Sequence, residues 1–259
     1  MDDPFYPLHR PEIYETLRAG ETQLFRAMDP DYQFFPSSDE VVPRGEAHDR
    51  MYRLRTGWAA RVRDLLDGRR QIIAIFLPGD LVGANCLFLS DQRDAVEALT
   101  PLSVNAVHHT KLRNLVQSDS DVAFRVMYQL AEDERRVRNW TVGLGRGSAE
   151  ERLAMFMLEM RGRLRRRRLI SDDTFHLPMK QQQIADCVGL NFVHVNRVLG
   201  RFRDTGVMAM AKGTVTIIDV AKLAAIAGPM QDRSELDDPL FPDLEPTAGP
   251  QLELKRSDD

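Results

Sequence analysis

The sequence predicts an α+β protein with a β-rich N-terminal domain, one long helix and a C-terminal helix-turn-helix followed by a β-hairpin. Three observations support this order. Short apolar runs alternate with glycine and proline between about 34 and 110, as strands and turns do. An amphipathic helical pattern covers about 119–144. Two shorter helical patterns, separated by Gly189, then occupy 177–206.

We place the domain boundaries to match these changes in pattern. The boundaries give an N-terminal helix and β domain at 1–118, the long helix at 119–147, the helix-turn-helix domain at 148–230 and a tail at 231–259. The tail has nine acidic residues, three basic residues and four prolines without an amphipathic period, so we expect it to be disordered. An acidic tail could compete with nucleic acid for a basic domain, and a merely solubilising tail is the simpler interpretation.

The N-terminal domain begins with a predicted helix at 11–28 and continues as short strands. Strand-like runs lie at 51–54, 58–66, 71–77 and 102–107. Asp67-Gly68 is a hairpin turn signal between the second and third runs. Strands of this length at roughly 10-residue spacing are typical of a β-sandwich, barrel or roll.

The long helix carries an apolar heptad pattern, which is typical of a coiled-coil seam. Its apolar positions are Val126, Leu130, Val137, Trp140 and Leu144, with Asp133 at the remaining core position. We therefore predict a homodimer formed through 119–144. A second helix is expected from Ser148 to about 162, with Ser148 as its cap.

Residues 177–206 predict two short helices joined at Gly189, with Asn191 capping the second. Burial of the apolar positions 195, 198, 199 and 202 leaves Val193, Asn196, Arg197 and Gly200 on the opposite face. Asn and Arg pair bidentately with adenine and guanine in the major groove, and a small apolar group suits a thymine methyl. This pattern predicts a recognition helix, although two-helix hairpins with glycine turns also occur in proteins that bind no DNA.

The segments on either side of these two helices favour DNA binding as the interpretation. Residues 161–213 hold eleven Lys and Arg against four Asp, whereas the whole chain has a net charge of −4. Nucleic-acid binding requires such local positive potential. The run Arg165–Arg168 fits a solvated linker as well as it fits contact with phosphate. Lys212-Gly213 predicts a hairpin, which in this position is a wing. The candidate DNA-contacting residues are Lys180, Gln181, Phe192, Val193, His194, Asn196, Arg197 and Arg201.

Composition excludes several other classes of protein. No run of 18 apolar residues predicts a membrane span, and the acidic start MDDPFYPLHR lacks the apolar core of a secretory signal, so a cytoplasmic protein is expected. No catalytic motif such as GxSxG, HExxH or a phosphate-binding loop is present, so we predict no enzyme and no cofactor.

The histidines and cysteines suggest no metal centre. His108 and His109 are neighbours, but adjacent side chains on a strand face opposite ways, so no metal site is predicted. Two cysteines cannot by themselves hold an iron–sulfur cluster. Cys187 fits an apolar helix face, and we interpret Cys86 as a packed thiol rather than a redox sensor.

Over about 11–228 the chain resembles the Crp/Fnr family, named for the cyclic-AMP receptor protein and the fumarate–nitrate reductase regulator. The resemblance rests on YRLRTGWAARV, DGRRQIIAIFLPGDLVG, ERLAMFML and QQQIADCVGLNFVHVNRVLGRFRDTG. The VHVNR core resembles a subgroup with no assigned cyclic nucleotide. The resemblance implies a cyclic-nucleotide-binding-like β-roll, a dimerisation helix and a winged helix-turn-helix. It also implies a transcription regulator whose homodimer binds palindromic double-stranded DNA and contacts RNA polymerase.

The recognition helix departs from the family pattern Arg-Glu-Thr-Val-(Ser or Gly)-Arg, of which only Val195 and Arg197 are present. By the resemblance Arg197 is the guanine reader. Val193 replaces a Glu that reads a cytosine amino group, so the preferred base at that position should change, with thymine one option. His194 replaces a Thr that touches phosphate and either does the same or is a solvent-exposed histidine without a partner.

The effector site departs further. Members that bind cyclic AMP have Glu after the cassette glycine and Ser or Thr after the cassette arginine, whereas here Gly83 precedes Ala84 and Arg93 precedes Asp94. An acid beside a phosphate repels it. We therefore expect the domain to sense a signal other than cyclic AMP, with an unidentified small molecule or a pure scaffold as the open alternatives. A ligand-binding or interaction module with degenerate DNA binding is the alternative for the whole chain.

Overall fold

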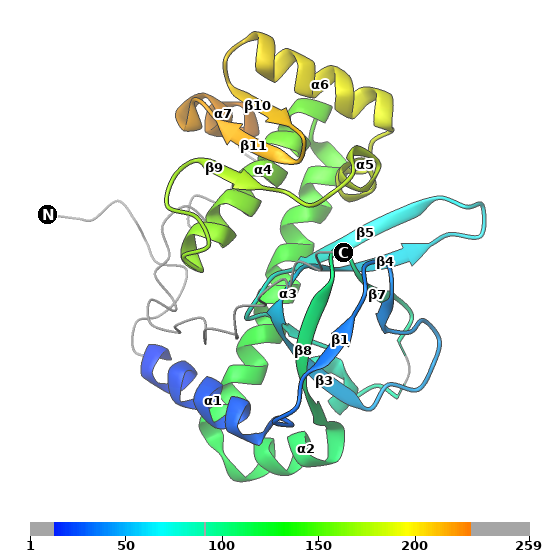
Figure 1. The fold of residues 1–259 in the computed structure, drawn as a ribbon, viewed down its shortest axis with the longest axis vertical. Helices are drawn as coiled ribbons and strands as arrows, with labels where there is room; N and C mark the ends of the chain where they lie inside the picture. The colour runs from blue at the N-terminus through cyan, green and yellow to red at the C-terminus, as the bar shows by residue number, and fades with distance from the viewer. Residues whose placement is uncertain (1–12, 91, 229–259) are drawn as a thin grey trace, which may run out of the picture.

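The computed structural model describes residues 13–90 and 92–228. They form an N-terminal β-sandwich, a long central helix that runs beside it, and a mainly helical C-terminal domain that lies at the far end of that helix (Figure 1). The α+β class predicted from the sequence is confirmed. The predicted acidic tail at 231–259 lies outside the described residues.

Two four-stranded antiparallel sheets make up the sandwich, in the orders β1-β8-β3-β6 and β2-β7-β4-β5. The strands are β1 (Gln33–Phe35), β2 (Glu40–Val42), β3 (Arg50–Thr56), β4 (Ala59–Asp64), β5 (Arg70–Phe76), β6 (Leu81–Val82), β7 (Ala95–Ala98) and β8 (Leu102–His108). Side chains from both sheets, among them Leu54, Phe76 and Val104, are buried together between them. The four runs predicted from the sequence are β3, β4, β5 and β8.

Helices close the side of the sandwich that faces the central helix α3 (Ser120–Arg146). They are α1 (Tyr14–Ala27), the short 3₁₀ helix η2 (Ala84–Leu87) and α2 (His109–Ser118). Asp119 caps α3 by accepting hydrogen bonds from the amides of Asp121 and Val122. A β-carbon at Gly20 of α1 would lie 2.1 Å from the backbone oxygen of Asp121, so only glycine allows α1 and α3 to approach this closely.

The predicted dimer seam on α3 is wrong for Val126, because that side chain is 3% exposed and packs against α1 and the sandwich of the same chain. Leu130 also packs against this core, and Trp140 packs against the C-terminal core. Asp133 accepts hydrogen bonds from Gln129 and Arg136 of the same helix. Of the five predicted seam positions, Val137 is the one classed as exposed, and Leu144 is partly buried.

The C-terminal domain begins with α4 (Ala149–Arg166), where Ser148 and Glu151 form a reciprocal capping box. The other elements are β9 (Thr174–His176), α5 (Gln181–Val188), α6 (Phe192–Asp204), β10 (Met208–Ala211), β11 (Thr214–Ile217) and α7 (Val220–Ala227). Phe156, Ile184, Val195 and Phe202 share one buried core. That core is continuous with Ile72 and Ile75 of β5, so the two domains of the chain are packed against each other. Among the described helices, none has the length and apolarity that crossing a membrane requires.

Candidate nucleic-acid interface

The turn between α5 and α6 has the geometry that the sequence predicts. Gly189 ends α5 with φ 63° and ψ 38°, a left-handed conformation that favours glycine. A β-carbon there would also lie 2.7 Å from the Leu144 side chain at the end of α3. The Asn191 side chain then caps α6 by accepting a 2.9 Å hydrogen bond from the amide of His194. The central helix therefore holds this turn directly.

One face of α6 is buried and the other is open. Val195, Val198 and Phe202 are buried in the domain core. On the outer face Val193 is 61% exposed and Arg197 is exposed. Asn196 is half-buried, and a β-carbon at Gly200 would meet nothing within 4 Å, so this face is unobstructed. Figure 1 shows α6 along the outer edge of the domain, away from the sandwich.

The other candidate DNA-contacting residues surround this face. Phe192 and His194, in the first turn of α6, are exposed, as is Lys180 at the start of α5, while Gln181 is half-buried. Arg201 is exposed but forms an ion pair with Glu150 of α4. Phosphate therefore has to compete with Glu150 for Arg201.

The predicted wing is present as the hairpin β10–β11. Its turn residues Lys212 and Gly213 have φ 49° and 77°, the two positive values that a tight type I′ hairpin needs. Val215 and Ile217 point into the core, as their alternation with threonine predicts. The strand β9, which the sequence analysis missed, pairs with β11 and completes a three-stranded sheet. The wing thus follows α6 as a rigid extension of the same domain.

Part of the basic excess between 161 and 213 is used inside the protein. Arg163 is 2% exposed and donates to Asp80 at 2.9 Å and to the Ile75 carbonyl at 2.7 Å. Arg167 pairs with the same carboxylate, and Arg161 and Arg165 pair with Asp173. The Arg165–Arg168 run is therefore neither a plain solvated linker nor wholly free for phosphate, because two of its members form ion pairs.

Asp80 is a residue that sequence reasoning missed as a contact between the domains. It lies in the Pro78-Gly79-Asp80 turn of the sandwich. Its partner Arg163 lies in the last turn of α4, and its partner Arg167 comes directly after that helix. Burial by itself raises the pKa of Asp80, but the Arg167 and Arg163 guanidinium groups outweigh it and hold that pKa well below its usual range. Asp80 is thus a buried carboxylate that joins the sandwich to the DNA-binding domain.

The residues predicted for an effector site lie at the start of η2 and just before β7. Gly83 has φ 79°, and a β-carbon there would lie 2.6 Å from His48 Nε2, while Ala84 is buried. Arg93 is exposed, and Asp94 accepts a hydrogen bond from Arg63 of β4 at 3.0 Å. The negative charge expected to repel a phosphate is thus already paired with a cation.

Polar groups inside the cassette region are incompletely satisfied. The Asn85 amide donates to Gln92 Oε1 at 2.8 Å, which ties η2 to the residue before Arg93. In the described part of the chain, His48 Nε2, Asn85 Oδ1 and Gln92 Nε2 are buried without a hydrogen-bond partner. Buried groups of this kind mark places where a polar ligand or water can be accommodated.

The two cysteines fit the prediction of packed thiols. Both are buried and reduced. Burial raises the pKa of the Cys86 thiol to about 11, and the pKa of Cys187 is also raised by burial. The reactive thiolate is therefore scarce at neutral pH in both.

Comparison with known proteins gives the same arrangement. Residues 32–119 match the cyclic nucleotide-binding domain, and residues 151–226 match the Crp-like helix-turn-helix domain. Among solved structures, FixK2 from Bradyrhizobium japonicum is 29% identical with a TM-score of 0.70, covering 76% of this chain and 96% of that one. A CRP-family transcriptional regulator from Thermus thermophilus is 28% identical with a TM-score of 0.63 over the same shares of both chains.

Curated relatives cover most of the chain. The nitrogen fixation regulation protein FixK of Bradyrhizobium diazoefficiens is 30% identical over 216 residues, which is 83% of this chain and 89% of the relative. The transcriptional activator protein FnrL of Cereibacter sphaeroides is 28% identical over 207 residues, covering 78% of this chain and 82% of the relative. Sequence, domain order and helix-turn-helix geometry agree, and this chain belongs to the Crp/Fnr family of DNA-binding transcription regulators, which are not enzymes.

Proposed function

We propose that this chain acts as a homodimer that reads a palindromic operator with two copies of α6 and then contacts RNA polymerase. The observation that carries the proposal is the outer face of α6, where Asn196 and Arg197 stand on a capped, rigid helix with a buried opposite face. Arg197 is assigned to guanine, Asn196 to adenine and Val193 to a thymine methyl, which are the pairings that side-chain chemistry favours.

Phosphate contacts are assigned to the residues around that face. Lys180 at the start of α5 and His194 in the first turn of α6 are exposed on either side of the helix-turn-helix turn. Gln181 and Phe192 complete the predicted contact surface. Arg201 joins them only by giving up Glu150, so its contribution to affinity is expected to be smaller than that of an unengaged arginine.

A different stripe of α3 supports the dimer. Phe124 and Met127 are about half exposed, and the exposed positions continue at alternating spacings of three and four residues. The full stripe is Phe124, Met127, Ala131, Glu134, Arg138, Thr141 and Gly145, all exposed. This is the spacing of a two-stranded coiled coil, and Val137 lies beside it. We therefore propose that the dimer interface lies along this exposed stripe of α3 rather than along the face predicted from the heptad pattern.

The sandwich is proposed to sense a signal other than cyclic AMP. Ala84 supplies a methyl group where the family's ribose-binding Glu would stand, and Arg93 is exposed rather than held in the cassette. Buried atoms of His48, Asn85 and Gln92 that have no hydrogen-bond partner among the described residues support a polar ligand of different shape. Asp80, Arg163 and Arg167 offer a direct connection from the sandwich to α4.

Selection of bound sites from random double-stranded DNA tests this function. The proposal predicts an enriched palindrome whose half-sites lie about 10 base pairs apart, one helical turn from centre to centre. Enrichment of single half-sites would contradict the dimer. Absence of enrichment, with binding that only follows salt concentration, would favour the alternative of an interaction module with degenerate DNA binding.

A further inference from the structure

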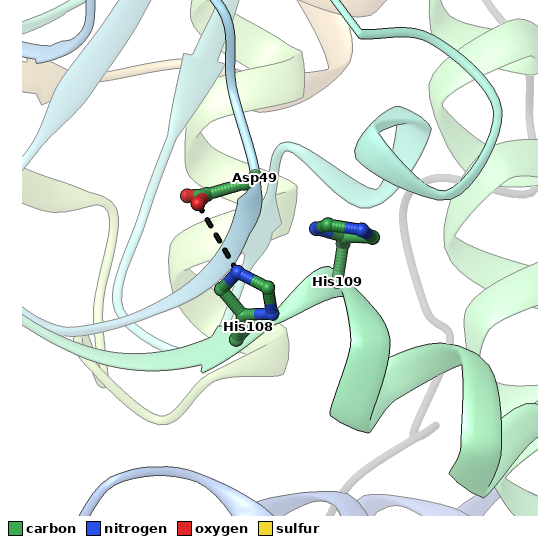
Figure 2. Close-up of side chains that lie close together, drawn as sticks. All are labelled: Asp49, His108 and His109. Carbon is green, nitrogen blue, oxygen red and sulfur yellow. Dashed lines mark hydrogen bonds and ion pairs between the residues drawn. The ribbon is translucent and has the colours of Figure 1, made fainter.

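Three metal-binding side chains meet where the sandwich joins α2. Asp49 precedes β3, His108 is the last residue of β8, and His109 is the first residue of α2. One ligand atom from each lies within 4.8 Å of the other two. Figure 2 shows the three side chains converging from these segments. The sequence-based expectation that the two histidines face opposite ways is wrong, because the strand ends at His108 and a helix begins at His109.

The backbone beneath this cluster is held firmly. Arg50 of β3 pairs with His108 of β8 in the sheet, and the His109 amide donates a 2.6 Å hydrogen bond to the Asp49 carbonyl. The two imidazole rings have centroids 4.5 Å apart. Ligands on rigid elements lose little freedom when a metal arrives, so the arrangement is preorganised for one.

The hydrogen bonding of the cluster leaves acceptor capacity for a cation. His109 Nδ1 is buried and, within the described residues, has no hydrogen-bond partner. Among the residues that the structure describes, its Nε2 contacts the Thr110 hydroxyl at 3.4 Å. A buried imidazole nitrogen without a partner is costly, and coordination of a metal through Nδ1 of His109 would remove that cost.

Asp49 is positioned to give one oxygen. Its Oδ2 lies 3.1 Å from His108 Nε2, and its Oδ1 lies 3.8 Å from Arg50 Nε. Arg50 also contacts Asp29 at 3.4 Å, so it is shared between two exposed carboxylates. One carboxylate oxygen therefore remains with the histidines, and the carboxylate would bind a metal through that single oxygen.

Binding of a metal by His108 requires two of its hydrogen bonds to break. Its Nδ1 accepts the amide hydrogen of Thr110 at 3.2 Å, so Nε2 carries the ring proton and donates it to Asp49. A metal on Nε2 displaces that proton, and a neutral ring then needs its proton on Nδ1, which ends the hydrogen bond from Thr110. Metal binding thus exchanges two hydrogen bonds for coordinate bonds, and moderate affinity is expected.

We propose that Asp49, His108 and His109 form a binding site for one divalent transition-metal ion. Two imidazoles and one carboxylate favour Zn²⁺ and similar ions over Ca²⁺ and Mg²⁺, which prefer oxygen ligands. Bonds of about 2 Å to one ion place two ligand atoms no more than about 4 Å apart, and the three ligand atoms here already lie within 4.8 Å of one another, so small side-chain shifts are enough to bring them around an ion. Exposure of Asp49 leaves room for water to complete the coordination.

Titration of the metal-free full chain with zinc chloride, followed by calorimetry, tests the proposal. We expect one saturable site per chain and a higher melting temperature with zinc. His109→Gln and Asp49→Asn should each weaken binding by at least the roughly 10–100-fold that loss of an outer-shell partner costs. His176→Gln is the matched control, because His176 is exposed on β9 outside the cluster.

The melting curve in chelator shows which variants are folded. If His109→Gln unfolds, Asp49→Asn carries the test, since the Asp49 side chain is 57% exposed and its loss leaves the core intact. Absence of saturable binding would overturn the proposal. Equal zinc affinity in the native chain and in a folded Asp49→Asn or His109→Gln variant would also overturn it. An equal loss of zinc affinity in His176→Gln would do so as well, because it would indicate binding by dispersed surface histidines.

Discussion

Replacement of Asp80 by Asn tests the connection between the sandwich and the DNA-binding domain. The substitution keeps the side-chain volume but removes the charge that faces Arg163 and Arg167. Arg163 is 2% exposed and, within the described part of the chain, would keep the Ile75 carbonyl at 2.7 Å and a longer, 3.4 Å contact with Glu159. A buried guanidinium would therefore lose its strongest partner.

The expected magnitude follows from that burial. Breaking a buried pair by removing one partner costs about 3–5 kcal/mol, because the other charge stays buried. Arg167 is 22% exposed and is partly screened by water, so we expect the lower half of this range. Each 1 kcal/mol lowers the melting temperature of a chain of this size by roughly 2–4 °C. Asp80→Asn should therefore melt about 6–16 °C below the native chain.

Differential scanning calorimetry measures this shift, and Asp204→Asn provides the control. Asp204 pairs with Arg203 at 2.9 Å, but both side chains are about two-thirds exposed. Exposed pairs contribute about 0–1 kcal/mol, so the control should melt within a few degrees of the native chain. If Asp80→Asn melted as the control does, the ion pairs at Asp80 would not hold the two domains together.

Three further predictions concern the pH dependence of Asp80, the exposed stripe of α3 and the reactivity of Cys86. Because the pKa of Asp80 is lowered on folding, its carboxylate stabilises the chain above about pH 4, its unfolded pKa, and this contribution is lost as pH falls through the lower folded value. Between about pH 5 and 2 the free energy of unfolding should therefore fall more in the native chain than in Asp80→Asn. An equal fall in both would contradict the lowered pKa. Phe124→Asp with Met127→Asp should give monomers in light scattering, while Phe34→Asp, on the sandwich, should leave the dimer intact; a dimeric double variant would place the interface elsewhere. Cys86 should resist alkylation by iodoacetamide at neutral pH in the folded chain, since burial raises its pKa to about 11, and rapid labelling detected by mass spectrometry would contradict a packed thiol.

Elements with a long repeating pattern were predictable from the sequence. The recognition helix, its cap at Asn191 and the glycine turn before it all have local signals, and the wing is marked by Lys212-Gly213. The short strands β1, β2, β6, β7 and β9 have two to four residues each, too few for alternation to show. Helix α2 was missed because β8 runs into it without a glycine or proline between them.

Contacts between distant segments could not be derived from the sequence. The heptad on α3 shows which side chains share a face but not what covers that face, and here α1 and the domain's own core cover it. The pairing of Asp80 with Arg163 joins residues 83 positions apart, and no local pattern reports it. The meeting of His108 with His109 depended on a strand-to-helix junction whose position the sequence did not mark.

The central claim is that the outer face of α6 reads DNA sequence. Arg197→Ala and the control Arg203→Ala, measured by fluorescence anisotropy on a selected operator and a scrambled duplex at several salt concentrations, test it most directly. Arg197→Ala should cost about 1–3 kcal/mol, or roughly 5- to 150-fold in Kd, on the operator and little on the scrambled duplex. Arg203 already pairs with Asp204, so its removal should act weakly and alike on both. Equal losses on the two duplexes for Arg197→Ala would show that Arg197 only binds phosphate and would contradict base reading by α6.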